Sequence, residues 1–379
     1  MNSTKPSHSG CFSEVDHDRN LPDCDLLSPL NIRGVKLKNR IGVSPMCQYS
    51  SKDGMADDWH LVHLGSRAVG GAGLVFTEAT AVTPQGRISP GDLGIWDEKH
   101  VDPLKRIVDF ILRMGAIPGI QLAHAGRKGS CAEPWLGGKP LNEKEGGWPV
   151  VSPSAIPFLE GGLVPQELTL LGINEIREAF NHAVSKALKA GFKIIEIHAA
   201  HGYLLHEFLS PLSNHRNDSY GGSLENRMRL LCEIVQDTRS QIPPEMPLFV
   251  RVSATDWVEE GWNLEQSIEL ACRLKSLGVD LIDCSTGALV PHAKIPVGPN
   301  YQVPFAEQIK GKAGMMTAAV GLITEPHQAN DIITSGSADL VLLAREFLRE
   351  PYWGLKAQNV LQQEPGWPTP YGYAIKRRS

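Results

Sequence analysis

Short apolar runs alternate with longer amphipathic stretches along most of the chain. From Leu26 onward, runs rich in Val, Ile and Leu are each followed by residues in which apolar positions recur at helical spacing. Strands that are covered by helices on both faces read as continuous apolar runs, because both of their faces are buried. The alternation therefore predicts an α/β fold with a mostly parallel sheet.

The apolar runs predict eight strands, each followed by a helix. The expected strands are 40–43, 74–79, 117–122, 194–197, 248–253, 281–285, 315–320 and 340–343. The expected helices are 57–69, 101–114, 174–190, 224–240, 264–277, 304–312 and 326–335, with one more after the last strand. Eight such units predict a (β/α)8 TIM barrel, whose active site lies at the carboxyl ends of the strands.

Three segments depart from this regular alternation. The apolar runs 30–32 and 35–37 flank Arg33 and Gly34, which predicts an N-terminal hairpin before the barrel. Residues 129–172 are rich in Gly, Pro and Trp and have no sustained periodicity, which predicts a long lid insertion after strand 3. Residues 204–220 are expected to form a loop.

The domain organisation follows from the same pattern. Residues 26–363 are expected to form one barrel domain, since α/β barrels of this length fold as single domains. Residues 1–25 are polar and charged, which predicts a disordered N-terminal extension. Residues 364–379 are expected to form a separate C-terminal tail.

Charge and cysteine content restrict the classes of partner. The 379 residues include 37 basic and 42 acidic side chains, a net charge of −5, which argues against a nucleic acid or an anionic membrane as partner. Seven cysteines, an odd number without a C-x-x-C pair, predict reduced thiols and a cytoplasmic location. No stretch has the length of a membrane helix or the apolar core of a signal peptide.

The stretch 194–203 holds the strongest candidate for chemistry. A predicted buried strand ends directly in His198, His201 and Tyr203, and all three side chains can donate hydrogen bonds and move protons. Two weaker alternatives are a zinc site and core histidines that bond to the backbone. A zinc site is disfavoured because no H-E-x-x-H helix is present and no Cys or carboxylate lies nearby at ligand spacing.

Other predicted strands also end in polar or small residues. The polar ones are Ser44, Cys47, Gln121, Arg251 and Arg345, and a barrel would bring them to the same mouth. The last two strands end in Gly321 and in Ala344 followed by Arg345. Small residues let backbone N–H groups approach an anion, and the arginine adds charge, so these positions predict a phosphate site.

Taken in order, these motifs resemble the Old Yellow Enzyme family of flavin-dependent ene-reductases, in its thermophilic-like, xenobiotic-reductase-type branch. The motifs are SPMCQY at 44–49, EAT at 78–80, QLAHAGRK at 121–128, HAAHGYLL at 198–205, NDSYGGS at 217–223 and RVS at 251–253. The resemblance covers residues 26–353. It implies a non-covalently bound FMN, with NADPH or NADH as the reductant.

The resemblance also implies a role for each matching residue. The flavin ring would be lined by Ser44, Pro45, Met46 and Cys47, and its pyrimidine edge would be held by Ala79 and Gln121. Arg251 would lie at the end of the ring that becomes negative on reduction. The phosphate would be held by Gly321, Ala344 and Arg345. His198 and His201 would bind the substrate oxygen, with Tyr49 and Lys128 as further substrate-binding residues. Tyr203 would be the proton donor, and no metal is expected.

The implied reaction is transfer of hydride from NAD(P)H through the flavin to Cβ of an activated alkene, an α,β-unsaturated carbonyl or nitro compound, with protonation at Cα. Three alternatives stay open: a non-catalytic flavin-binding module, a dienoyl-CoA-reductase-like enzyme without the iron–sulfur part, and a barrel isomerase without flavin. The branch also implies a homo-oligomer in which the tail 364–379 contacts a neighbouring subunit, although no single residue of the tail matches that role.

Overall fold

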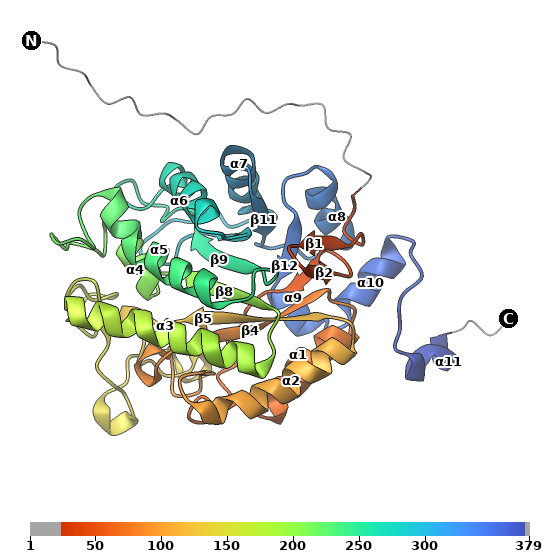
Figure 1. Ribbon diagram of the computed structural model, residues 1–379, viewed down its shortest axis with the longest axis horizontal. Coiled ribbons are helices and arrows are strands. Elements are labelled where there is room, and N and C mark those ends of the chain that lie inside the picture. Colours follow the sequence, from red (N-terminus) through yellow and green to blue (C-terminus); the bar gives the residue numbers. More distant parts are fainter. Residues whose placement is uncertain (1–23, 376–379) are drawn as a thin grey trace, which may run out of the picture.

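The computed structural model describes residues 24–375, and these form the predicted TIM barrel (Figure 1). Eight parallel strands close in the order β10-β11-β12-β3-β4-β5-β8-β9. They are β3 (Ile41–Val43), β4 (Leu74–Ala81), β5 (Ile117–Ala123), β8 (Ile194–Ala199), β9 (Leu248–Ser253), β10 (Leu281–Ser285), β11 (Met316–Ala319) and β12 (Leu340–Leu343). All strand residues but Ile117 and Met316 are buried, as the continuous apolar runs predicted.

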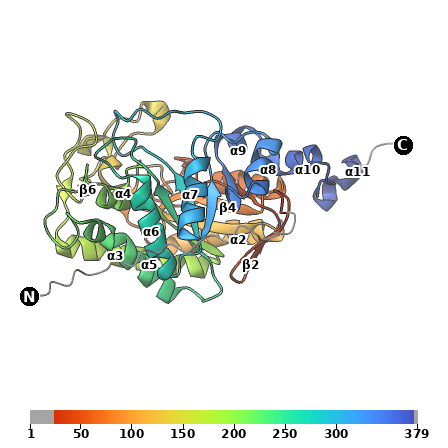
Figure 2. The ribbon, with the colours of Figure 1, turned by 90° about the horizontal axis from the view of Figure 1, so that it is seen from above.

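Helices surround the strands on the outside of the barrel (Figures 1 and 2). They are α1 (Asp58–Val69), α2 (Val101–Arg113), α3 (Leu170–Ala190), α5 (Leu224–Gln241), α6 (Leu264–Ser276), α7 (Val303–Ala313), α8 (Pro326–Thr334), α9 (Arg345–Arg349) and α10 (Trp353–Val360). In α2 the buried side chains Leu104, Ile107, Val108 and Ile111 recur at helical spacing and face the sheet. None of the helices in the described part of the chain is long and apolar enough to cross a membrane.

The predicted hairpin is present and closes one end of the barrel. Strands β1 (Leu30–Ile32) and β2 (Val35–Leu37) pair antiparallel. Their apolar side chains pack with residues at the beginnings of the barrel strands in one buried cluster, which includes Phe76 and Phe249. The rings of these two phenylalanines are 6.1 Å apart, edge to face. The amino-terminal end of the barrel is therefore filled with apolar side chains.

The insertion after β5 contains little regular structure. It holds a two-stranded sheet of β6 (Val151–Ser152) and β7 (Gln166–Glu167). Three short 3₁₀ turns lie in or next to the insertion, namely η3 (Gly126–Lys128), η4 (Pro134–Leu136) and η5 (Glu143–Glu145). Three more lie elsewhere in the described residues, namely η1 (Pro84–Gly86), η2 (Glu98–His100) and η6 (Thr369–Tyr371). The insertion ends earlier than predicted, because the Thr169 side chain accepts a hydrogen bond from the Gly172 N–H (3.1 Å) and caps α3.

The prediction that residues 204–220 form a loop is wrong for the first six of these residues. Residues Leu204–Leu209 form the helix α4, and every one of its six side chains is buried. A helix that is buried all round has no polar face, so no amphipathic period marks it in the sequence.

Both predicted terminal segments fall mainly or partly outside the described residues. Of the extension predicted over 1–25, only residues 24 and 25 are described, and residues 376–379 of the tail are not. The described part of the tail holds the short helix α11 (Gly372–Ile375), which stands away from the barrel beyond α10 (Figures 1 and 2).

Candidate active site

The turn after β8 brings the two histidines and the tyrosine together. The ring of His198 lies 5.2 Å from that of His201 and 5.1 Å from that of Tyr203, nearly perpendicular to both. His201 and Gly202 both have positive φ angles, 60° and 68°, which turn the chain sharply at the end of the strand. A side chain at 202 would also collide with the Ala288 carbonyl, 2.5 Å from the position of a Cβ atom.

A contact between a buried histidine and a buried aspartate holds this turn in place. The Gly202 N–H donates to Nδ1 of His206 (2.9 Å), and Nε2 of His206 lies 2.9 Å from Asp256. Both side chains are fully buried on the far side of the turn. The position of the catalytic candidates is therefore set by buried neighbours rather than by a mobile loop.

His198 is a neutral hydrogen-bond donor. Its Nδ1 accepts the Ala200 N–H (3.2 Å), so the ring proton is on Nε2. Burial, and then the positive charge of Arg251, lower the pKa of His198 well below its ordinary value. At neutral pH the ring is uncharged and offers one N–H group.

His201 is held by two serines from the next two strands. Its backbone N–H donates to Ser253 Oγ (2.9 Å), and its Nε2 lies 2.6 Å from Ser285 Oγ. The Ser285 hydroxyl can also donate to Gln302 Oε1, but that acceptor is farther away (3.3 Å). We therefore assign the Ser285 proton to His201 Nε2, which leaves the ring proton on Nδ1.

The charge state of His201 agrees with this arrangement. Burial, and then Arg251 and His198, lower the pKa of His201 well below its ordinary value. The two histidines are therefore both neutral, and each has one N–H group left for a ligand.

Tyr203 keeps its proton, and a lysine lies beside it. Burial raises the pKa of the Tyr203 hydroxyl well above its ordinary value. Lys128 Nζ donates to the carbonyls of His201 (2.9 Å) and Ala288 (3.0 Å) and lies 5.3 Å from the centre of the Tyr203 ring. Burial lowers the pKa of Lys128 to about 8, so at neutral pH it is mostly a cation that faces the tyrosine.

The segment after β3 also lies at the carboxyl end of the barrel. Ser44, Pro45, Met46 and Cys47 follow the last residue of the strand, and the Gln48 N–H is held by Glu78 (3.2 Å) on β4. Burial, and then the charges of Asp92 and Glu78, raise the pKa of the Cys47 thiol well above its ordinary value. Cys47 is therefore a thiol at neutral pH and not a nucleophilic thiolate.

Inside the barrel, a layer of polar side chains lies between the apolar end and the mouth. Strand register places Gln121 opposite Glu196, and Arg251 opposite Asp283. The Arg251 guanidinium donates to Ser44 Oγ (3.2 Å), so it joins the β3 segment to this layer.

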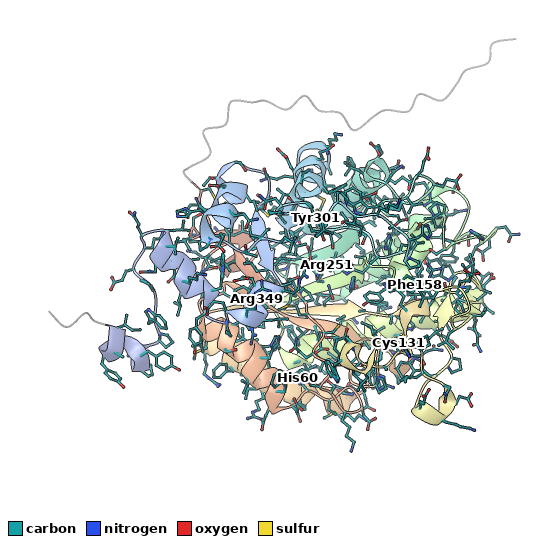
Figure 3. All side chains as sticks on the ribbon, turned by 180° about the vertical axis from the view of Figure 1, so that it is seen from behind. His60, Cys131, Phe158, Arg251, Tyr301 and Arg349 are labelled. Atoms are coloured by element: carbon teal, nitrogen blue, oxygen red, sulfur yellow. The ribbon has the colours of Figure 1, made fainter. Side chains whose placement is uncertain are left out.

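The ends of β11 and β12 form a separate cavity. It has a volume of about 200 Å³, and Gly321, Ala344 and Arg345 line it together with Tyr301 and Arg349. Gly321 has a φ angle of 120°, and a Cβ atom there would lie 2.8 Å from the Gln302 amide. In Figure 3, Arg251 lies between Tyr301 and Arg349 on one side and Phe158 and Cys131 on the other.

A second cavity lies under the insertion. It has a volume of about 210 Å³, and its walls are mainly apolar, with Phe158, Leu159 and Leu163 from the insertion. Tyr49 and Lys128, both predicted to bind substrate, line the same cavity. Lys128 Nζ lies 4.6 Å from the centre of the Phe158 ring, which gives the cavity one cationic wall.

The structure thus brings the predicted residues into three connected groups. The first group consists of His198, His201, Tyr203 and Lys128. The second consists of Ser44 to Cys47, Ala79, Gln121 and Arg251. The third consists of Gly321, Ala344 and Arg345. Sequence reasoning missed Ser253, Ser285 and Asp283. Alternation would have found them, because Ser253 lies two residues after Arg251 on the same face of β9, and Asp283 and Ser285 on β10 are the register partners of Arg251 and Ser253.

The described residues suit FMN. The cavity at β11 and β12 has the size for a phosphate, and Arg345 supplies its positive charge, whereas Arg349 is paired with Glu346 in the same cavity. Arg251 joins the β3 segment, through Ser44, to His198, which is its neighbour in strand register.

Comparison with known proteins gives relatives over nearly the full chain. The sequence profile of the NADH:flavin oxidoreductase / NADH oxidase family matches residues 25–364. The NADPH dehydrogenase of Geobacillus sp. (strain WCH70) is 51% identical over 352 residues, which are 90% of this chain and 98% of that protein. The Bacillus subtilis NADPH dehydrogenase is 47% identical over 348 residues, which are 91% of this chain and 98% of that protein.

Solved structures have the same barrel. Morphinone reductase superposes with a TM-score of 0.74 at 25% identity, over 94% of each chain. The complex of 2-naphthoyl-CoA reductase gives a TM-score of 0.80 at 28% identity over 90% of this chain, which spans only 52% of that longer protein. The chain therefore belongs to the NADH:flavin oxidoreductase / NADH oxidase family, the Old Yellow Enzyme family, and is an FMN-dependent oxidoreductase.

Proposed function

We propose that the protein is an ene-reductase that uses NAD(P)H, through FMN, to reduce activated alkenes. The observation that carries this proposal is the group of two neutral histidines and one protonated tyrosine at the end of β8. Such a reaction adds hydride to Cβ of the alkene and a proton to Cα. Bound FMN supplies the hydride, and the protein supplies position, charge stabilisation and the proton.

The histidines would bind the carbonyl or nitro oxygen of the substrate. As hydride reaches Cβ, negative charge develops on that oxygen, and Nε2–H of His198 and Nδ1–H of His201 can both donate to it. These bonds strengthen as the charge develops, so they stabilise the transition state more than the ground state. Tyr49 would form a further contact with the bound substrate.

Tyr203 would deliver the proton to Cα. Its raised pKa keeps the hydroxyl protonated at neutral pH, as a general acid requires. The Lys128 cation next to the ring would stabilise the negative charge that remains on the tyrosine after transfer. Lys128 would thus support proton donation as well as substrate binding.

The cofactor-binding roles follow the groups seen in the structure. Gly321, Ala344 and Arg345 would hold the FMN phosphate, and Arg251 would lie at the end of the ring that becomes negative on reduction. Gln121 and Ala79 would border the pyrimidine edge. Cys47, a thiol at neutral pH, would contact the ring and adjust its potential without attacking it.

The cavity under the insertion suggests the class of substrate. Its volume of about 210 Å³ exceeds the roughly 150 Å³ of a cavity known to hold one benzene molecule. Alkenes that carry an aromatic or other apolar substituent would fill it, with residues 129–169 as a lid. Two structural neighbours, named for morphinone and 2-naphthoyl-CoA, support substrates with bulky rings.

The test is anaerobic stopped-flow of the purified holoenzyme. We expect NADPH or NADH to bleach the flavin absorbance, and enones and nitroalkenes to restore it. A flavin that is reduced but never reoxidised by any activated alkene would instead support a non-catalytic flavin-binding module. Chromatography of the released cofactor gives the matching control, since FAD or no flavin would contradict the placement of the phosphate site.

We also propose a homo-oligomer and a cytoplasmic location. The exposed aromatic side chains of the tail support the first, because Tyr373 is 87% exposed on a helix that stands away from its own barrel. The odd number of cysteines supports the second. Sedimentation of the full chain and of a chain that ends at residue 363 would test whether the tail takes part in assembly.

A further inference from the structure

Two fully buried acids in the barrel have no part in the reaction proposed above. Glu196 on β8 and Asp283 on β10 each have 0% of their surface exposed, and both lie in the polar layer next to Arg251. Burying a carboxyl group costs free energy of folding, because an ionised carboxylate loses its hydration. Their charge states therefore bear on the site above them.

The two acids have different partners. Glu196 Oε1 accepts a hydrogen bond from the Gln121 side-chain amide (2.8 Å), and its Oε2 has no partner. Asp283 Oδ2 forms an ion pair with Arg251 Nε at 3.1 Å, but the geometry is not that of a hydrogen bond, and neither Asp283 oxygen has a hydrogen-bond partner. Only Asp283 is thus in direct contact with a cation.

If both acids were ionised, this layer would contain two negative charges and only one positive charge. Arg251 is the cation that faces both acids, and His198, the next titratable group along β8, is neutral. Two carboxylates would leave one unpaired negative charge in the barrel, beside the end of FMN that gains negative charge on reduction. One carboxylate paired with Arg251 leaves none.

We propose that Glu196 is an uncharged acid that fixes the Gln121 amide, and that Asp283 is the counter-ion that limits the positive field of Arg251 at the flavin. This inference rests on the proposed position of FMN above Arg251. With its N–H engaged by Glu196, Gln121 turns its carbonyl oxygen to the site. Both acids are positioning residues, because they act through Gln121 and Arg251.

Electrostatics supports this division. Burial, and then the charge of Asp283, raise the pKa of Glu196 well above its ordinary value. Burial also raises the pKa of Asp283, to about 6, and Arg251 opposes that rise. At neutral pH the proton therefore resides on Glu196 and not on Asp283.

Infrared spectroscopy of the holoenzyme tests the charge state of Glu196. We expect the difference between the wild-type and Glu196→Gln spectra at neutral pH to contain a carboxylic-acid C=O band that shifts in D₂O. The difference is needed because burial also raises the pKa of Asp92 and of Glu207 to about 7, so both contribute bands of their own. Asp256→Asn is the matched control, because Asp256 is also fully buried but contacts with His206 and Ser210 lower its pKa despite burial, and its difference spectrum should contain no such band. If the wild-type and Glu196→Gln spectra are the same, Glu196 is ionised and the inference is wrong.

Flavin midpoint potentials test the role of Asp283. Asp283→Asn should shift the potential to a more positive value, because the full charge of Arg251 then stabilises reduced FMN. Glu196→Gln keeps the charge and shape of the neutral acid and should leave the potential near the wild-type value. An equal positive shift in both variants, or no shift in Asp283→Asn, would overturn the inference.

A third variant separates this inference from the proposed function. Arg251→Met should shift the potential to a more negative value if FMN lies next to Arg251. An unchanged potential in Arg251→Met would show that the flavin is elsewhere, and the proposed site would then fail independently of the charge state of Glu196. Should Asp283→Asn fail to fold, the infrared comparison still decides whether Glu196 is neutral.

Discussion

The two ends of the barrel have opposite contents. At the amino-terminal end, the hairpin β1–β2 and residues such as Phe76 and Phe249 form a cluster of apolar side chains. At the carboxyl end, the same strands carry Gln121, Glu196, His198 and Arg251, which are buried but polar. Strand β9 shows the change within two residues, from Phe249 to Arg251.

The contrast separates stability from function along each strand. Burying apolar surface stabilises the fold, whereas burying a carboxyl or guanidinium group costs free energy unless it is paired. The polar residues at the carboxyl end therefore lower the stability of the barrel, but they hold the hydrogen-bond donors of the site in fixed positions. Substitutions at the two ends should accordingly affect different measurements.

The largest effect is expected for Tyr203→Phe, which removes only the hydroxyl group. Loss of a general acid typically costs about 10²–10⁴ in rate, so reoxidation of the flavin by cyclohexenone should fall by that factor. Phenol binding and flavin reduction by NADPH should stay near wild-type values. Stopped-flow absorbance measures both half-reactions.

Two comparisons sharpen this first prediction. Nitroalkenes give stabilised nitronates that need no immediate proton, so their reduction should be affected least. Tyr220→Phe removes a hydroxyl that binds Glu233 on α5 and should change neither rate. A wild-type rate with cyclohexenone in Tyr203→Phe would mean that another group supplies the proton.

At the apolar end, Phe249→Ala should mainly affect stability. Removing a fully buried phenylalanine typically costs about 3–5 kcal/mol in the free energy of unfolding, through lost burial and a residual cavity. Urea denaturation measures it, with Leu348→Ala, at an exposed position on α9, as the control. A loss below about 1 kcal/mol would show that the hairpin cluster does not stabilise the barrel.

His198→Ala returns to the polar end and should leave stability largely unchanged. One missing donor to a developing negative charge typically lowers the rate about 10²–10³-fold. The same donor holds the ligand oxygen, so phenols should also bind more weakly in a spectral titration. His182→Ala, at an exposed position on α3, is the control. Weaker stability with an unchanged rate would support a structural histidine instead.

The smallest effect is expected for Ser285→Ala, which leaves His201 in place but removes the group that sets its tautomer. We expect about a fivefold slower reoxidation by enones, because the net value of one hydrogen bond is roughly 1 kcal/mol. Thr286→Val disturbs Gln302 without touching His201 and should have less effect. Nitrogen NMR of labelled histidine would show whether the proton of His201 leaves Nδ1.

The apolar end of the barrel was the more predictable of the two. The strand runs and the hairpin follow from local patterns, because buried parallel strands must be continuously apolar. Once the eight strands are located in the sequence, His198, Gln121 and Arg251 can be assigned to the carboxyl-terminal parts of three of them. These features depend on residues close in sequence or on the regular geometry of the fold.

Other parts of the site depend on contacts that no local pattern records. Helix α4 is buried on every side, so it has no polar face to reveal it. The proton position on His201 depends on Ser285, 84 residues away, and on the competing acceptor Gln302. The neutral state of Glu196 depends on burial and on Asp283 from a different strand.

Closure of the barrel also has a consequence for biosynthesis. The last strand, β12, pairs with the first, β3, and the Arg40 guanidinium binds the Asp339 carbonyl 299 residues later in the chain. At roughly 5–20 residues per second, a ribosome needs about 15–60 s to make that interval. Throughout this time one edge of β3 has no partner, and an unpaired edge is a place where nascent chains can join. The β3 edge is only three residues long, Ile41–Val43, which limits that hazard.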